Sequence, residues 1–305
     1  MSAIIKGLTI PSPLQELRLL TSKKKKLRVL IKRDDLIHPW LSGNKYRKLK
    51  YNLLHVKANN IDTILTFGGA YSNHLHATAG ACALAGINSI GIIRGEIDKS
   101  NPTLKFCIEQ GMKLISVSRT AYRNKENAEE IQEILHQFPE AYTIPEGGSN
   151  KLAMKGASEI MEELTIQLGR QPDHIVLSCG TGGTTAGLLT SDNLSSCVLA
   201  FSALKSSHLK DEINLLSDFK NADKLTVNTN FHFGGYAKWE TGLIQFINDF
   251  ESEYDIPLDH VYNGKAMYGL MELIRSDYFE SGSIICYIHT GGSQGKEGLK
   301  YTKNK

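Results

Sequence analysis

Short apolar segments alternate with helix-like segments along nearly the whole chain of 305 residues. Several apolar runs, such as IVLS and IICYI, are nearly continuous, as expected of strands that are buried on both faces. The alternation predicts an α/β fold with open, twisted, mostly parallel sheets flanked by helices. The predicted strands are Leu27–Lys32, Thr63–Phe67, Ser89–Ile93, Lys113–Val117, His174–Ser178, Cys197–Ala203, Leu225–Phe231 and Ser283–Ile288.

Helices are expected between these strands. The spacing of Leu49, Leu53 and Val56 predicts one amphipathic helix that begins near Lys45. The other predicted helices are Ser72–Ala85, Pro102–Gln110, Ala128–Phe138, Lys151–Leu168, Leu209–Phe219 and Gly242–Tyr254. The units between about Thr63 and Tyr142 are expected to form a smaller sheet of their own. Ligands of such sheets bind beyond the carboxyl ends of the strands, so the turns that leave the strands are the places to search.

Composition narrows the class of protein. The 35 basic and 32 acidic residues leave a net charge of +3, which does not favour a nucleic-acid partner. No apolar stretch approaches the roughly 18 residues of a membrane span, and the N-terminus has no signal-peptide core. The five cysteines form no CxxC pair, which argues against a zinc site or a disulfide framework. We therefore expect a cytoplasmic protein with no membrane partner.

The first distinctive turn is GGAYSNH, in which Gly68 and Gly69 end a strand and Ser72 and Asn73 begin a helix. A serine or asparagine there is a common helix N-cap, and this alternative explains one of the two residues. The double glycine and the second polar residue favour a site for an anion such as a carboxylate. His74 and His76 are two residues apart on the expected helix and so diverge, and no metal site is predicted.

The second distinctive turn follows the apolar strand HIVLS and contains Gly180, Thr181, Gly182, Gly183, Thr184 and Thr185. A helix is expected to begin near Ala186. Glycines let several backbone N–H groups converge, and threonine hydroxyls add donors, which is typical of a cradle for a single phosphate. The loop lacks the GK[ST] of a Walker A motif and the third glycine of a dinucleotide motif. A merely tight turn is the alternative.

Lys45 lies where the first turn of a helix is expected, in the segment SGNKYRKL. A lysine at this end of a helix is mildly disfavoured by the helix dipole. One interpretation is a solvated surface lysine, and the other is an amine kept neutral so that it attacks a carbonyl. A phosphate cradle, a carboxylate site and such a lysine together indicate a pyridoxal phosphate enzyme that acts on an amino acid.

The chain also resembles the family of 1-aminocyclopropane-1-carboxylate (ACC) deaminases and D-cysteine desulfhydrases, within the tryptophan-synthase-β-like, fold type II pyridoxal phosphate enzymes. The resemblance runs nearly end to end. It rests on the motifs KRDDL…SGNKYRKL, GGAYSNH, PEGGSN, SCGTGGTTAGL, YNGKAMYGL and HTGG. It implies a homodimer and two domains, a large cofactor-binding domain of residues 1–47 and 153–305 and a small inserted domain of residues 48–152.

The resemblance also implies roles for single residues. Lys45 is expected to form a Schiff base with the cofactor, and Lys45, Ser72 and Tyr262 are the expected catalytic residues. Gly180, Thr181, Gly182, Gly183 and Thr184 are expected to bind the phosphate, Asn73 the phenolic oxygen and Thr290 the pyridine nitrogen. The substrate is expected to contact Ser72, Asn73, His74, Tyr236 and Tyr262.

Three positions bear on the substrate. Tyr71 replaces the family's frequent glutamine and is expected to narrow the pocket. Deaminases of this family carry glutamate at position 263 and leucine at position 290, whereas desulfhydrases carry a small hydroxylated residue and threonine. This chain has Asn263 and Thr290. A neutral hydroxyl at the pyridine nitrogen gives a weaker electron sink than a carboxylate.

Because a β-thiol leaves readily, elimination needs a weaker sink than ring opening does. The sequence therefore predicts α,β-elimination from a D-amino acid such as D-cysteine, which gives pyruvate, ammonia and sulfide. Two alternatives are enzymes of the same class, which catalyse ACC deamination or elimination from another β-substituted amino acid. The others are a phosphate- or nucleotide-binding protein without pyridoxal chemistry and a catalytically silent protein.

Overall fold

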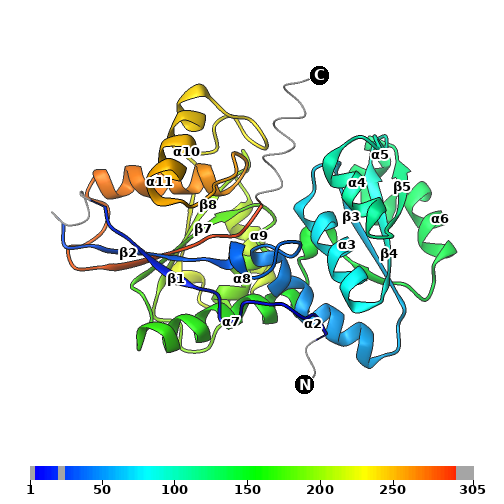
Figure 1. Cartoon of the computed structure of the whole chain (residues 1–305), viewed down its shortest axis with the longest axis horizontal. Helices are drawn as coiled ribbons and strands as arrows, with labels where there is room; N and C mark the ends of the chain where they lie inside the picture. The colour runs from blue at the N-terminus through cyan, green and yellow to red at the C-terminus, as the bar shows by residue number, and fades with distance from the viewer. Residues whose placement is uncertain (1–3, 20–24, 293–305) are drawn as a thin grey trace.

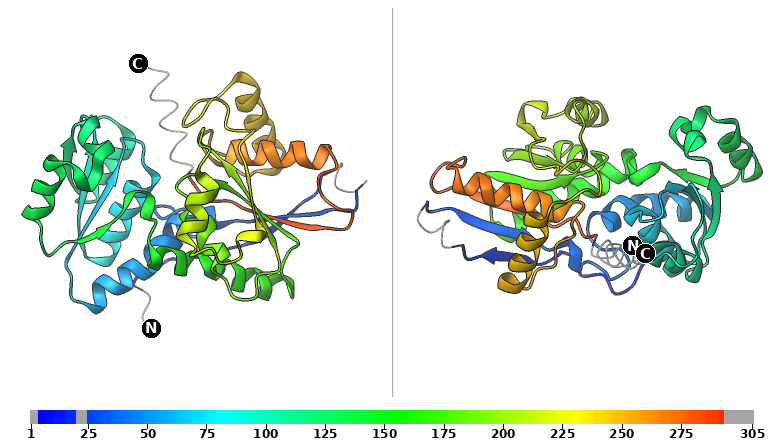
Figure 2. Two further views of the ribbon diagram at one scale, coloured as in Figure 1. Left: turned by 180° about the vertical axis from the view of Figure 1, so that it is seen from behind. Right: turned by 90° about the horizontal axis from the view of Figure 1, so that it is seen from above.

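The computed structural model describes residues 4–19 and 25–292. The chain forms two sheets that lie in separate lobes, with helix α2 (Asn44–Ala58) running between them (Figure 1). The view from behind in Figure 2 shows the same separation. Within residues 4–19 and 25–292, no helix is long and apolar enough to cross a membrane.

The larger sheet has six strands in the order β1-β2-β10-β7-β8-β9. Only the edge strand β1 runs antiparallel to its neighbour, and the other strands pair in parallel. The strands are β1 (Leu14–Leu17), β2 (Arg28–Lys32), β7 (His174–Cys179), β8 (Cys197–Ser202), β9 (Leu225–Asn228) and β10 (Ile284–Ile288). The helices of this lobe are α7 (Lys151–Leu168), α8 (Gly183–Leu189), α9 (Leu209–Leu216), α10 (Thr241–Tyr254) and α11 (Asn263–Arg275).

The smaller sheet has four parallel strands in the order β5-β4-β3-β6. They are β3 (Thr63–Gly68), β4 (Asn88–Arg94), β5 (Lys113–Val117) and β6 (Tyr142–Ile144). Its helices are α3 (Asn73–Ala85), α4 (Pro102–Glu109), α5 (Arg119–Asn124) and α6 (Glu129–Gln137). Strands from residue 63 to residue 144 make up this sheet, while the predicted domain limits at residues 48 and 152 stay a prediction.

The strands of the larger sheet are buried on both faces, and this explains their continuous apolar runs. Val176 and Tyr287 pack in a core with α10 and α11. Their sequence neighbours Ile175 and Cys286 point to the other face, into a second core that includes residues of α7 and α8. Successive side chains of a strand alternate between faces, so both kinds of position must be apolar here.

The predicted α/β fold is confirmed, and every predicted strand and helix has a counterpart in the structure. Three boundaries were wrong by three residues: α8 begins at Gly183 and not near Ala186, α9 ends at Leu216 and not at Phe219, and β9 ends at Asn228 and not at Phe231. Two strands and two α-helices were missed. Strands β1 and β6 are short, with four and three residues, and α5 has only six residues. Helix α11 begins with Asn263 and Gly264, which are poor helix formers, and its apolar face packs into the core.

Candidate active site

A cavity of about 410 Å³ lies where the turns after β3, β7 and β10 meet the start of α2. Carboxyl ends of parallel strands therefore form the site, as the fold class predicts. The structure brings the predicted site residues together around this one cavity. They are Lys45, Ser72, Asn73, His74, Gly180, Thr181, Gly182, Gly183, Thr184, Tyr236, Tyr262 and Thr290.

Gly43 explains why the segment before Lys45 has its unusual sequence. It precedes α2 with φ of 70°, and a Cβ at this position would lie 1.9 Å from the carbonyl oxygen of Thr290. The N–H of Asn44 donates to that same oxygen over 3.3 Å. Only glycine permits both the positive φ and the close approach. The start of α2 is thus held against the chain that follows β10.

Lys45 extends into the cavity, where its Nζ donates to Oδ1 of Asn44 over 2.6 Å. The amide of Asn44 in turn donates to the Thr184 hydroxyl over 2.8 Å, which links the lysine to the glycine-rich loop. Burial lowers the pKa of Lys45 to about 8, although the charge of Asp259 acts in the opposite direction. A substantial fraction of this amine is therefore neutral near pH 8, as a nucleophile or base requires.

Lys48 is a second cation of the site, and its position there was not predicted. Its Nζ donates to the carbonyl of Gly147 (2.8 Å) and to Oγ of Ser149 (3.1 Å). Burial and the charge of Lys45 lower its pKa to about 7. The sequence offered only one signal, the spacing of three residues from Lys45, which places both lysines on one face of a helix.

The glycine-rich loop forms a cavity wall that side chains would fill. A Cβ at Gly183 would lie 2.4 Å from Oγ of Ser149 and 2.9 Å from Nζ of Lys48. A Cβ at Gly180 would lie 3.0 Å from the ring of Tyr262. Helix α8 has no side-chain N-cap within the described chain, so the N–H groups of its first turn are available. Backbone donors beside a lysine suit a phosphate, in agreement with the prediction for Gly180–Thr184.

Ser72 and His74 lie at the start of α3. Ser72 is the N-cap, and its hydroxyl accepts from the N–H of Leu75 over 3.2 Å. His74 is buried, with Nε2 at 2.8 Å from the hydroxyl of Thr66, which itself donates to the carbonyl of Ile144. Nε2 must therefore carry the proton, and Nδ1 has no partner among the described residues.

Because burial lowers the pKa of His74 to about 3, the ring is neutral. With Nε2 engaged by Thr66, the side chain has no proton to donate to a carboxylate. His74 can then donate to a carboxylate through its main-chain N–H, which lies in the first turn of α3. The binding of the substrate carboxylate by Ser72, Asn73 and His74 stays a prediction. For His74 the predicted donor is the main-chain N–H.

Tyr262 and Tyr236 line the cavity as an edge-to-face pair with ring centroids 6.2 Å apart. Burial raises the pKa of Tyr262 well above its usual value, and the neighbouring Tyr236 and Asp259 raise it further. At neutral pH the phenol is protonated, so it can donate a proton. Asp259 positions it, because its carboxylate accepts from the N–H of Tyr262 over 2.7 Å.

Hydroxyl and amide groups surround Thr290. Its Oγ1 lies 2.9 Å from Oγ of Ser178 and 3.2 Å from Oδ1 of Asn263. The amide of Asn263 donates to Asp259 and to the carbonyl of Gly291, at 2.9 Å and 2.6 Å. Asp259, the carboxylate bonded to Asn263, is thus separated from Thr290 by a neutral amide. Ser178 was missed because it is a single polar residue at the end of an apolar strand.

Comparison with known proteins identifies the family. The sequence model of the family described as pyridoxal-phosphate dependent enzyme matches residues 5–191. The chain belongs to this family. A putative ACC deaminase of Pyrococcus horikoshii is 32% identical over 286 residues, covering 88% of this chain and 85% of that protein. A mitochondrial bifunctional D-cysteine desulfhydrase/ACC deaminase of Arabidopsis thaliana is 34% identical over 290 residues, covering 87% and 72%.

The fold agrees with this membership. The crystal structure of an ACC deaminase homologue superposes with a TM-score of 0.81 at 28% identity, covering 98% of this chain and 95% of that one. The chain is therefore a pyridoxal phosphate-dependent lyase of the ACC deaminase family, and the predicted family, cofactor and enzyme class are confirmed. The glycine cradle and the amine of Lys45 fit the phosphate and the aldehyde of this cofactor.

Proposed function

We propose that this enzyme catalyses α,β-elimination from a D-amino acid such as D-cysteine. One water is consumed, the Cβ–S bond breaks, and the products are pyruvate, ammonia and sulfide. The observation that carries the proposal is the neutral surrounding of Thr290, whose hydroxyl has Ser178 and Asn263 as partners. We expect Thr290 to bond the pyridine nitrogen of the cofactor. A hydroxyl there does not hold a proton on the ring as a carboxylate does.

When bound, pyridoxal phosphate withdraws electrons from Cα of an amino acid. The other tasks fall to side chains of this chain. Lys45, with its lowered pKa, is suited to take the proton from Cα. Tyr262, with its raised pKa, is suited to protonate the leaving sulfur. Gly180–Thr184 and Lys48 would bind the phosphate, while Ser72, Asn73 and the N–H of His74 would bind the substrate carboxylate.

ACC deamination is the second candidate, because the relatives named above include a putative ACC deaminase and a bifunctional enzyme. The test compares kcat/KM for D-cysteine, L-cysteine and ACC. We expect D-cysteine to exceed ACC by at least about tenfold, a difference of about 1.4 kcal/mol in transition-state binding. A clear preference for ACC would contradict the proposal.

A variant tests whether Thr290 contributes through its hydroxyl. Thr290→Val keeps the shape of the side chain and is expected to lower kcat for D-cysteine by about tenfold, the loss of one buried hydrogen bond. Thr165→Val is the matched control, since its hydroxyl bonds only the carbonyl of Met161 within α7. Equal activity of the two variants would mean that the hydroxyl of Thr290 has no part in the reaction.

A homodimer in the cytoplasm stays part of the proposal. The resemblance to the family supports the dimer, and light scattering of the purified enzyme tests it. The Arabidopsis relative is mitochondrial by its name, so localisation of a tagged chain in its native cell is the test of the compartment.

A further inference from the structure

A second and larger cavity, of about 850 Å³, adjoins the first. The two share seven wall residues that include Tyr71, Asn73, Arg94, Tyr236 and Tyr262. The second cavity is therefore continuous with the active site, and we call it the outer cavity because Lys45 and the glycine-rich loop do not line it. A volume of this size is typical of sites for molecules considerably larger than cysteine.

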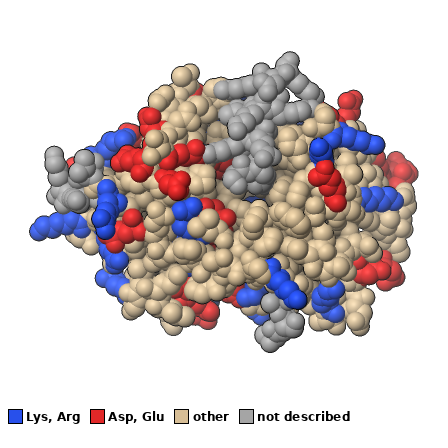
Figure 3. Space-filling view, in the orientation of Figure 1, with Lys and Arg blue, Asp and Glu red and all other residues tan. Residues whose placement is uncertain are grey.

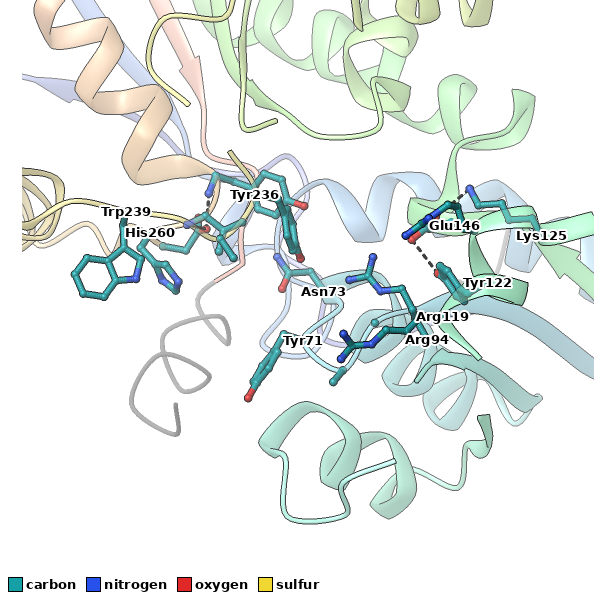
Figure 4. Close-up of a pocket in the computed structure, with 17 residues that line it drawn as sticks. Tyr71, Asn73, Arg94, Arg119, Tyr122, Lys125, Glu146, Tyr236, Trp239 and His260 are labelled. Carbon is teal, nitrogen blue, oxygen red and sulfur yellow. Dashed lines mark hydrogen bonds and ion pairs between the residues drawn. The ribbon is translucent and has the colours of Figure 1, made fainter. Parts of the chain in front are cut away.

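Arginines gather on the small-lobe wall of this outer cavity. Arg94 ends strand β4, and Arg119 and Arg123 lie on the short helix α5. The Arg94 guanidinium lies 5.8 Å from the centre of the Tyr122 ring, and its Nη2 lies 3.4 Å from where a Cβ at Gly69 would be. Figure 4 shows the side chains of Arg94 and Arg119 pointing toward Tyr71 and Asn73.

These arginines have no acidic partner among the described residues. The two carboxylates of the cavity wall are engaged elsewhere. Glu146 accepts from the Tyr122 hydroxyl (2.8 Å) and pairs with Lys125 (3.0 Å), while Asp259 accepts from backbone N–H groups at the start of α11. The positive charge of Arg94 and Arg119 is therefore not neutralised within the cavity.

Three other exposed arginines of the protein behave differently. Arg28, Arg170 and Arg275 each pair with a carboxylate, namely Glu16, Asp173 and Glu272. Acidic and basic side chains also lie interspersed over the face drawn in Figure 3. Arg94 and Arg119 thus lack the carboxylate partner that these three arginines have, and a guanidinium is suited to bind a carboxylate, sulfonate or phosphate through paired N–H donors.

We propose that the preferred substrate carries an anionic group on its β-substituent and that Arg94 and Arg119 bind this group. The inference rests on the proposed elimination. An anionic thioether of D-cysteine would react with water to give pyruvate, ammonia and an anionic thiol, as the Cβ–S bond breaks and the sulfur takes up a proton. Tyr71, Asn73 and Arg94 line both cavities, whereas Arg119 lines the outer cavity, so an anionic group at the arginines stays in the space that joins the two cavities.

The first experiment compares two substrates of the same size. S-(carboxymethyl)-D-cysteine carries the anion, and S-(carbamoylmethyl)-D-cysteine is its neutral amide. We expect the native holoenzyme to prefer the anion by about tenfold in kcat/KM, a modest effect because the guanidinium groups are partly solvated. Arg94→Gln/Arg119→Gln should reduce the preference to near unity and leave kcat/KM for D-cysteine within about twofold. Arg275→Gln, which removes one positive charge elsewhere, should keep the preference.

The second experiment separates this inference from the proposed reaction. D-2-aminoadipate has a methylene in place of the sulfur, so nothing can be eliminated, and D-homoglutamine is its neutral amide. Calorimetry on the holoenzyme should show tighter binding of D-2-aminoadipate, and the double variant should lose the difference. If this result is obtained while D-cysteine is not turned over, the proposed reaction fails and the anion site stands. Equal affinity of the two ligands for the native holoenzyme would overturn the anion site.

Discussion

Three cations within four residues at the start of helix α2 have sharply different surroundings. Arg47 is fully buried and forms paired hydrogen bonds with Asp34 (2.6 and 2.7 Å) and Glu163 (both 2.9 Å). Lys45 and Lys48, two residues before it and one after it, have only neutral oxygen partners among the described residues, from Asn44, Gly147 and Ser149. One turn of helix thus separates a cation that is paired with two carboxylates from two lysines that have no carboxylate as a hydrogen-bond partner among the described residues.

The pKa values follow this difference. Burial alone would lower the pKa of Arg47, but Asp34 and Glu163 outweigh it and raise the pKa. Burial lowers the pKa of Lys45 to about 8 and that of Lys48 to about 7. A cation with carboxylate partners keeps its charge and serves the structure, whereas one without them releases its proton readily and is available for chemistry or for an anionic ligand.

The largest expected effect concerns Lys45. Lys45→Ala should lower kcat on the best substrate by about ten-thousandfold or more, because it removes both the covalent attachment of the cofactor and the base. Borohydride reduction and peptide mapping of the native enzyme should place the pyridoxyl label on residue 45. Lys48→Ala is the control, and the label in this variant should still be on Lys45. A label on Lys48 would reverse the assignment of the two lysines.

Arg47→Met should destabilise the protein without touching the cavity. It leaves Asp34, which is fully buried, without its cation, and such a loss costs roughly 3–5 kcal/mol. Urea denaturation measures the free energy of unfolding. Arg28→Met is the control, since Arg28 and Glu16 form an exposed pair whose loss should cost at most about 1 kcal/mol. Similar losses in both variants would mean that the buried network adds little stability.

The smallest effect is a pH dependence. Between pH 7 and the usual lysine pKa of 10.5, the unfolded chain binds a proton at Lys48 that the folded, cofactor-free protein has released. The free energy of unfolding should therefore rise with pH above 7, by about 1 kcal/mol per pH unit. Lys48→Met should reduce this slope, as measured by urea denaturation at pH 7 and pH 9. An identical slope in the variant would show that Lys48 does not titrate there.

Adding pyridoxal phosphate gives a second test of how Lys48 affects the pH dependence of stability. If the phosphate lies beside Lys48, its charge should raise the pKa of the lysine and remove most of the slope that this residue causes. A holoenzyme with an unchanged contribution from Lys48 would mean that the phosphate binds away from it.

Patterns that are local in sequence determined the fold class and the framework of the site. The period of apolar residues predicted the strands and helices, because burial on one or both faces dictates it. Glycine runs marked the turns after β3 and β7, because close backbone approach excludes a Cβ. Lys45 was found from its place at the start of a helix and from the resemblance to a family.

Only the tertiary structure decided which side chains and backbone groups surround those residues and how they change their pKa values and hydrogen bonds. Lys48 meets Gly147 and Ser149 across about a hundred residues of sequence, and Thr290 meets Ser178 across 112. The lowered pKa of Lys45 comes from burial, which no local pattern records. Arg94 ends an ordinary strand and Arg119 begins a short helix. Their shared position at the cavity, without a carboxylate partner among the described residues, could therefore not be predicted from the sequence. Pairing and desolvation depend on segments that meet only in the folded chain.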